Sequence, residues 1–379
     1  MKLEIKKMIR PKFLLFIGLM LIVSFLAGIF GELFAKLYLS KLSFFSDLYF
    51  TGATNLGSKE IVIREPRKVV VEQDLILAQI QNEISPATVS IYRKKIAKNL
   101  LDKAYLPSDY LAPAVVLTND GWLISQKNNQ VSIRDSIIVT ADKKEYQIEK
   151  IVEDAKTNII FIKIFAQNLA VTKFADSQKI TDSQQIAVYN KYYDQLNLAN
   201  ILDPKYKPIT NKFSLVQSDQ DLNNYILLNK NFKTELIGAP LYNFSSELIG
   251  FLATSDQVMP INYIAPIINQ VLKGEDLKRP YLGINYLNLS EISGLSEEDS
   301  QGVINGVLLW PDESGLALKN DSPLLNKLVK GDIIISLEDQ QLDKNNDLQD
   351  LLFEYKSGQE IRLKYLREKK EDELSVILK

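Results

Sequence analysis

The feature that most constrains the fold of this chain is a series of short apolar runs, separated by turn residues, between Ser85 and about Ile268. Short apolar runs bounded by turn residues are typical of β-strands and argue against alternating strand and helix units. Six such runs lie at 87–92, 112–117, 121–125, 136–140, 146–152 and 158–164. Six more follow at 184–189, 213–218, 224–229, 239–243, 247–252 and 259–264. The sequence therefore predicts a mainly β fold with two successive small barrels.

The N-terminus has a basic flank followed by an apolar run. Five positive charges against one negative give the first twelve residues a net charge of +4. The uncharged run from Phe13 to Gly31 is near the ~20 residues that cross a bilayer, and basic flanks stay cytoplasmic. We expect residues 1–35 to form a cytoplasmic tail and a single-pass transmembrane helix at the cell membrane, with the bulk of the chain extracytoplasmic. A cleaved signal peptide is the alternative, although no A-x-A site closes the run.

Three segments connect these parts. Residues 36–71 are expected to form a linker, since the stretch at 51–67 is rich in turn residues. A short amphipathic helix is predicted over Val71–Glu83, with Leu75, Leu77, Ile80 and Ile84 on one face. At 268–280 the pattern predicts a helix that ends at Gly274, followed by a charged hinge.

Composition excludes several functions. The chain has no Cys and no His, so disulfides, thiolate nucleophiles and every histidine-dependent mechanism are ruled out. With 45 Lys and Arg against 47 Asp and Glu, the net charge of −2 argues against nucleic-acid binding. No pattern indicates a cofactor or a metal. The acidic run at 219–224 lacks the spacing of a Ca²⁺ loop and predicts a solvated turn.

Five segments in order carry a family resemblance: ISPATVSIY at 84–92, NDGWLIS at 119–125, IVEDAKTNIIFIKI at 151–164, ELIGAPLYNFSSELIG at 235–250 and RPYLGI at 279–284. In this order they resemble the HtrA/Deg family of serine proteases. The resemblance implies a chymotrypsin-like double β-barrel at 72–274 and a PDZ domain at 275–379.

The catalytic positions that the resemblance implies hold other residues. Asn128 occupies the place of the catalytic His, Asn158 that of the Asp, and Ile237 that of the Ser. The oxyanion loop is altered as well, because Glu235 replaces a glycine of the family motif and Gly238 follows the missing nucleophile. Since loss of triad members costs ~10⁴ to 10⁶ in rate, the sequence predicts a pseudoprotease.

A relocated active site is the alternative to loss of catalysis. Ser125 with Lys127 lies near the former His position, and Ser245 and Ser246 follow the former nucleophile loop. Ordinary polar roles in a strand end and in a hairpin turn explain these residues better.

The PDZ resemblance implies a groove that binds a peptide C-terminus by strand addition. Its carboxylate loop corresponds to Tyr281, Leu282, Gly283 and Ile284. Leu348, Leu351, Leu352 and Tyr355 repeat at helical spacing on the segment that flanks the groove, which favours an apolar C-terminal ligand residue. The alternative is that this stripe faces only the domain core. Arg279 is expected to be a solvated linker residue or a positive charge near the carboxylate.

Together, these features predict a membrane-anchored, inactive HtrA-like protein that binds polypeptide C-termini or unfolded segments as a sensor, adaptor or holdase in envelope protein quality control. Family resemblance implies assembly as a homotrimer or with an active family member. Two alternatives remain open: an active serine endopeptidase with a relocated site, and a structural scaffold whose PDZ groove is closed.

Overall fold

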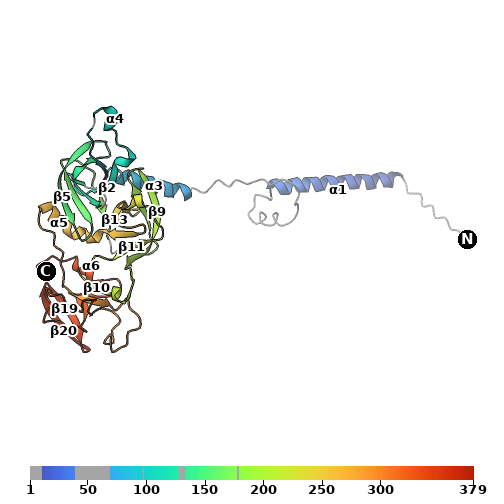
Figure 1. The fold of residues 1–379 in the computed structure, drawn as a ribbon. Coiled ribbons are helices and arrows are strands. Elements are labelled where there is room, and N and C mark those ends of the chain that lie inside the picture. Colours follow the sequence, from blue (N-terminus) through green and yellow to red (C-terminus); the bar gives the residue numbers. More distant parts are fainter. Residues whose placement is uncertain (1–10, 39–68, 97, 128–132, 177–178) are drawn as a thin grey trace. The chain divides into compact units, whose positions relative to one another are not determined.

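The computed structural model describes residues 11–38, 69–96, 98–127, 133–176 and 179–379, and it separates into two compact units, 1–67 and 68–379. The described part of the first unit is one helix, α1 (Pro11–Tyr38) (Figure 1). Its apolar side chains are exposed, Phe25 and Phe30 among them. Among the described residues, no helix is both long enough and apolar enough to span a bilayer.

The first barrel of the second unit is closed by six strands, which confirms the first half of the strand prediction. The strands are β1 (Thr88–Arg93), β2 (Tyr110–Val116), β3 (Trp122–Gln126), β4 (Ser136–Val139), β5 (Glu145–Asp154) and β6 (Ile159–Ile164). They pair in the order β1-β2-β3-β6-β5-β4. Alternate side chains, among them Val89, Ile91 and Leu123, fill the interior. A short helix, α4 (Leu100–Lys103), lies in the connection between β1 and β2.

The second sheet also closes on itself. Its strands are β7 (Lys173–Phe174), β8 (Gln185–Asn190), β9 (Gln195–Tyr206), β11 (Tyr225–Leu228), β12 (Pro240–Tyr242), β13 (Glu247–Leu252) and β14 (Gln257–Pro260). They pair in the order β12-β8-β9-β11-β14-β13-β7, and β12 also pairs with β13. A second small barrel is therefore present, as predicted.

One predicted strand of this barrel lies elsewhere. The run at 213–218 forms a 3-10 helix, η5 (Lys212–Leu215), and a strand, β10 (Val216–Ser218). β10 pairs with β15 (Asn285–Asn288) of the C-terminal domain, so the prediction that this run completes the second barrel was wrong. The twelve-residue strand β9, which the run pattern did not predict, supplies that edge instead.

Two helices bind the barrels together. Ile80 and Ile84 of α3 (Val69–Ile84) are buried in a core that both barrels share, whereas Leu75 is exposed. α5 (Ala265–Lys273) packs on the same core and ends at Gly274, which has the left-handed φ of +74°. Both predicted helices are confirmed.

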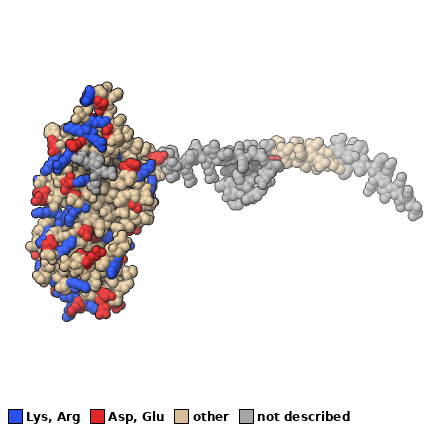
Figure 2. All heavy atoms as spheres, in the orientation of Figure 1, with Lys and Arg blue, Asp and Glu red and all other residues tan. Residues whose placement is uncertain are grey.

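The C-terminal domain has its own sheet and its own core. Besides β15 it contains β16 (Val307–Leu309), β17 (Ile333–Leu337), β18 (Gln340–Gln341), β19 (Glu360–Arg367), β20 (Lys370–Ile377) and the helix α6 (Leu348–Leu352). The order is β10-β15-β16-β17-β19-β20. The edge strand β10 comes from the connection between the barrel strands β9 and β11. Figure 2 shows basic and acidic side chains interspersed over the visible face of the second unit, 68–379.

Candidate functional site

The loop that the resemblance aligns with the family's nucleophile motif is folded into a tight turn. Residues Thr234–Leu236 form the 3-10 helix η6, and the N–H of Ile237 donates to the carbonyl of Thr234 at 3.1 Å. That N–H is one of the two that would line an oxyanion hole, and here it is used inside the turn. Gly238 follows with φ +88° and lies against Gln126 at the end of β3. No atom of the Ile237 side chain can act as a nucleophile.

Of the other two predicted triad positions, only Asn158 lies within the described residues. Asn158 is exposed, in the turn between β5 and β6, with a left-handed φ of +56°. Its carbonyl accepts a 2.7 Å hydrogen bond from the N–H of Lys127, the residue before Asn128. Asn128 itself lies outside the described residues. The structure thus places the end of β3 beside both Asn158 and Gly238, and it describes two of the three predicted triad residues.

The serines of a relocated site have other partners. Ser125 is fully buried, and its hydroxyl donates to the carbonyl of Pro113 at 2.6 Å. Lys127 instead pairs with Glu153 at 2.6 Å. Ser245 and Ser246 form the turn between β12 and β13, as the hairpin-turn interpretation predicts. None of these contacts joins a serine hydroxyl to the lysine.

The loop before β15 presents three consecutive backbone N–H groups to one carboxylate. The N–H of Leu282 donates to Oδ2 of Asp219, that of Gly283 donates to the same oxygen at 3.0 Å, and that of Ile284 donates to Oδ1 at 3.0 Å. Gly283 has φ +68°, and a Cβ there would lie 3.1 Å from Ser322. Both the left-handed backbone and the close approach require glycine at this position. This loop is therefore built to bind a carboxylate.

The strand that carries Asp219 is added to the edge of the C-terminal sheet. Val216 pairs with Leu287, Gln217 with Tyr286 and Ser218 with Asn285, all antiparallel. Asp219 is 3% exposed, so the prediction that its loop is solvated was wrong at this residue. An edge strand that ends in a carboxylate held by loop amides is the arrangement in which PDZ domains bind peptides.

Two further side chains hold the same segment. Gln349 on α6 donates to the carbonyl of Asp221 at 2.6 Å and to that of Asp219 at 3.4 Å. Lys319 donates to the side chain of Gln220 at 2.9 Å. The sequence pattern missed both Asp219 and Gln349. Their partners lie far away in the chain, so nothing in the local sequence distinguishes them from other polar residues.

The remaining predicted groove residues are placed as follows. The N–H of Tyr281 donates to the carbonyl of Lys379, so this amide is not part of the carboxylate loop, and a hydrogen bond to Asp321 raises the pKa of the Tyr281 hydroxyl to about 12. Leu348, Leu351 and Leu352 of α6 are buried in the domain core. Tyr355 lies beyond the end of this helix, so the predicted helical stripe does not extend to it, and it packs on the same core. Their contact with a peptide ligand stays a prediction.

Arg279 joins the C-terminal domain to the first barrel, in neither of the two expected roles. Its guanidinium bonds both carboxylate oxygens of Asp154, at 2.5 and 3.1 Å, and the carbonyl of Tyr263 at 2.8 Å. Burial acts to raise the pKa of Asp154, but the hydrogen bonds and charge of Arg279, with a bond from Thr157, outweigh it and hold that pKa below its usual value. The pair therefore connects the turn of Asn158 to the start of the C-terminal domain.

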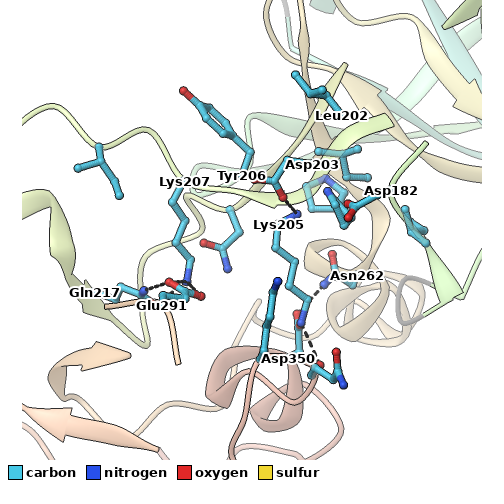
Figure 3. Close-up of a pocket in the computed structure, with 18 of the residues that line it drawn as sticks. Asp182, Leu202, Asp203, Lys205, Tyr206, Lys207, Gln217, Asn262, Glu291 and Asp350 are labelled. Carbon is cyan, nitrogen blue, oxygen red and sulfur yellow. Dashed lines mark hydrogen bonds and ion pairs between the residues drawn. The ribbon is translucent and has the colours of Figure 1, made fainter. Parts of the chain in front are cut away.

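A cavity of about 890 Å³ lies where β9 and the C-terminal domain face each other (Figure 3). Two lysines at the end of β9 and just after it are paired with side chains of the C-terminal domain and of β10. Lys205 bonds Asp350 at 3.0 Å, and Lys207 bonds Glu291 at 3.0 Å and the side chain of Gln217 at 2.8 Å. Through Gln217, the Lys207–Glu291 pair also contacts β10.

Comparisons with known proteins agree with the fold. Residues 280–378 match the PDZ domain family. The chain is 25% identical over 286 residues to a probable periplasmic serine endoprotease, DegP-like, of Pseudomonas putida, covering 70% of this chain and 55% of the relative. It is 24% identical to the serine protease Do-like HtrB of Bacillus subtilis, covering 69% of this chain and 60% of the relative. The chain thus spans little more than half the length of these curated relatives.

Solved structures give the same architecture. The HtrA-type protease AlgW with a tripeptide matches with a TM-score of 0.55 at 16% identity, covering 80% of this chain and 96% of that one. AlgW with a decapeptide matches with a TM-score of 0.51 at 16% identity, covering 80% and 98%. The chain is therefore a trypsin-like double β-barrel joined to a PDZ domain. The predicted resemblance to HtrA-family serine proteases is confirmed.

Proposed function

We propose that this chain binds polypeptide C-termini or unfolded segments through its PDZ groove and does not cleave them. The observation that carries the proposal is the set of three N–H groups at Leu282, Gly283 and Ile284, which converge on one carboxylate. A peptide C-terminus offers the same acceptor chemistry, and the edge of β15 accepts an added strand. Peptide-bound AlgW supports such a role for a similar fold.

The absence of cleavage is proposed from the composition and from the nucleophile loop. No histidine is present to act as the general base, and Ile237 replaces the nucleophile. The N–H of Ile237 is also bonded within its own turn. Loss of the base, the nucleophile and one oxyanion donor together leaves no route for acyl transfer at this site.

The proposed setting is the cell envelope. The basic flank and the apolar run at 13–31 support a single-pass anchor with an extracytoplasmic body, and relatives named periplasmic endoproteases support the compartment. There the protein would act as a sensor, adaptor or holdase in protein quality control. The proposed assembly is a homotrimer or a complex with an active HtrA-family protease.

The test uses the purified full-length chain with a fluorescent casein substrate and, in parallel, with a library of C-terminal peptides and their amidated forms. We expect binding that needs the free carboxylate and no hydrolysis. Hydrolysis abolished by Ser125→Ala, Ser245→Ala or Ser246→Ala would establish a relocated active site instead. Failure of every peptide to bind would favour the structural scaffold.

A further inference from the structure

A segment of the same chain lies along the edge strand β15 and against the carboxylate loop of the C-terminal domain. β10 occupies the edge of β15 where a peptide strand would pair, and Asp219 places its side-chain carboxylate on the loop amides. Asp219 is buried there, with 3% of its surface exposed. The two features of a bound peptide, an added strand and a terminal carboxylate, are both supplied from within the second barrel's own connection.

From this arrangement we infer that Asp219 is an internal substitute for a peptide C-terminus and that residues 216–219 compete with ligands for the groove. The inference rests on the proposed peptide-binding function and adds its regulation. The N–H groups that hold Asp219 cannot bind a second carboxylate in the same place. A peptide therefore binds only the fraction of molecules in which this segment has left, and its apparent affinity falls by that fraction.

The segment can leave the groove without unfolding a barrel. It lies in the connection between β9 and β11, whose ends are held by the pairing of Tyr206 with Tyr225. Only three residue pairs join β10 to the C-terminal sheet. The bond from the N–H of Asp219 to the carbonyl of Ile284 is long, at 3.4 Å. A connection anchored at its base can open locally while the barrel strands stay paired. Its release breaks the pairing of β10, the bonds to Asp219 and the side-chain bonds from Gln349, Lys319 and Lys207.

The chemistry of the internal ligand defines its competitor. A free α-carboxylate can accept the same three hydrogen bonds and, unlike an aspartate side chain, continues directly from the strand that pairs with β15. An amidated chain end carries no charge and places N–H donors against N–H donors. The displacing ligand is therefore a polypeptide with a free C-terminus in an extended conformation.

The experiment compares Asp219→Asn with a matched control in the full-length chain. Asp221 is exposed, lies two residues away, and contacts Gln349 through its backbone carbonyl rather than its side chain. Asp221→Asn thus removes the same charge without touching the loop amides. Two readouts are measured: hydrogen exchange of the amides at 282–284, and binding of a labelled decapeptide that ends in Leu with a free carboxylate.

For Asp219→Asn we expect exchange at 282–284 to rise at least tenfold and the decapeptide to bind at least tenfold more tightly, with Asp221→Asn unchanged. Unchanged exchange in Asp219→Asn would overturn the internal ligand. Faster exchange without peptide binding by any variant would keep the internal ligand and overturn the proposed function. Equal peptide affinity in all three proteins would overturn the competition.

A second measurement needs no variant and covers the case in which Asp219→Asn does not fold. The wild-type chain is saturated with the decapeptide, and amide exchange is followed at 216–219. Displacement predicts that amide exchange becomes faster at 216–219 than in the free protein. The amides at 282–284 should stay protected, because the peptide carboxylate replaces that of Asp219. Unchanged exchange at 216–219 under saturation would overturn the competition, because peptide and segment would then be bound at once.

Discussion

Two loops of this molecule have the means to hold a negatively charged oxygen with backbone amides, and they use those amides differently. At the former nucleophile loop, the N–H of Ile237 closes a turn onto Thr234. At the PDZ loop, the N–H groups of residues 282–284 are not bonded within their own turn and donate to the carboxylate of Asp219. Glycine accounts for part of the difference, because Gly283 holds φ +68°, whereas Glu235 occupies a place that the family motif gives to glycine. The difference teaches that a backbone amide can hold a carboxylate only where it is not already bonded within its own turn.

The largest expected effect comes from rebuilding the barrel loop. Asn128→His, Asn158→Asp and Ile237→Ser together should leave casein hydrolysis at background, because the N–H at 237 stays bonded to Thr234. Adding Glu235→Gly and Leu236→Asn should raise the rate by ~10² to 10³, the value of one oxyanion donor.

The rebuilt barrel is measured by initial rates on fluorescent casein. A variant of all five positions with alanine in place of serine at 237 serves as the control for contaminating protease. If the three-residue variant alone matched the five-residue variant, the inward turn of the loop would not limit the chemistry.

The next effect concerns the ion pair that joins the two regions. Asp154→Asn leaves the Arg279 guanidinium buried with a neutral partner, which should cost about 3 kcal/mol in the free energy of unfolding. The pKa of Asp154 is lowered in the folded protein, so its ionised carboxylate stabilises the wild type above about pH 4. This contribution is lost as the pH falls further. Asp154→Asn should lack this acid-dependent step.

Urea unfolding between pH 3 and pH 7 measures both effects. Glu153→Gln is the control, because the Lys127–Glu153 pair on the adjacent residue is largely exposed and is worth less than about 1 kcal/mol. An equal loss of stability in both variants would contradict a special role for the buried pair.

The strand pattern predicted most of the fold but not the partner of every strand. Six regular runs were enough to predict the strands of the first barrel, although the pairings of β1 with β4 and of β3 with β6 join strands that are not consecutive in the chain. The run at 213–218 is a short apolar run like those of the barrel strands, yet its partner lies in the next domain, and the run pattern carries no information about that choice. For the same reason Asp219 was predicted to be a solvated turn residue, because its burial depends on amides more than sixty residues away.

The smallest expected effect comes from the glycine of the PDZ loop. In an Asp219→Asn background, Gly283→Ala should weaken binding of the free-carboxylate decapeptide about tenfold, because a Cβ would meet Ser322 at 3.1 Å and strain the loop. Gly294→Ala is the control, since Gly294 also has a positive φ, of +92°, but nothing lies within 4 Å of its added Cβ. Both variants should lose about 1 kcal/mol of stability, and equal peptide affinities would contradict a loop that needs glycine to bind carboxylate.

The most direct measurement locks the internal ligand in place. Ser218 and Asn285 are opposite each other in the β10–β15 pairing, and the N–H and carbonyl of Asn285 bond Ala317 and Trp310 on its other side, so the pair is of the closer, non-hydrogen-bonded type. Because the chain has no cysteine, Ser218→Cys with Asn285→Cys gives a single disulfide. We predict that the oxidised protein does not bind the decapeptide and that reduction restores binding. Equal binding by the oxidised and reduced proteins would contradict the account.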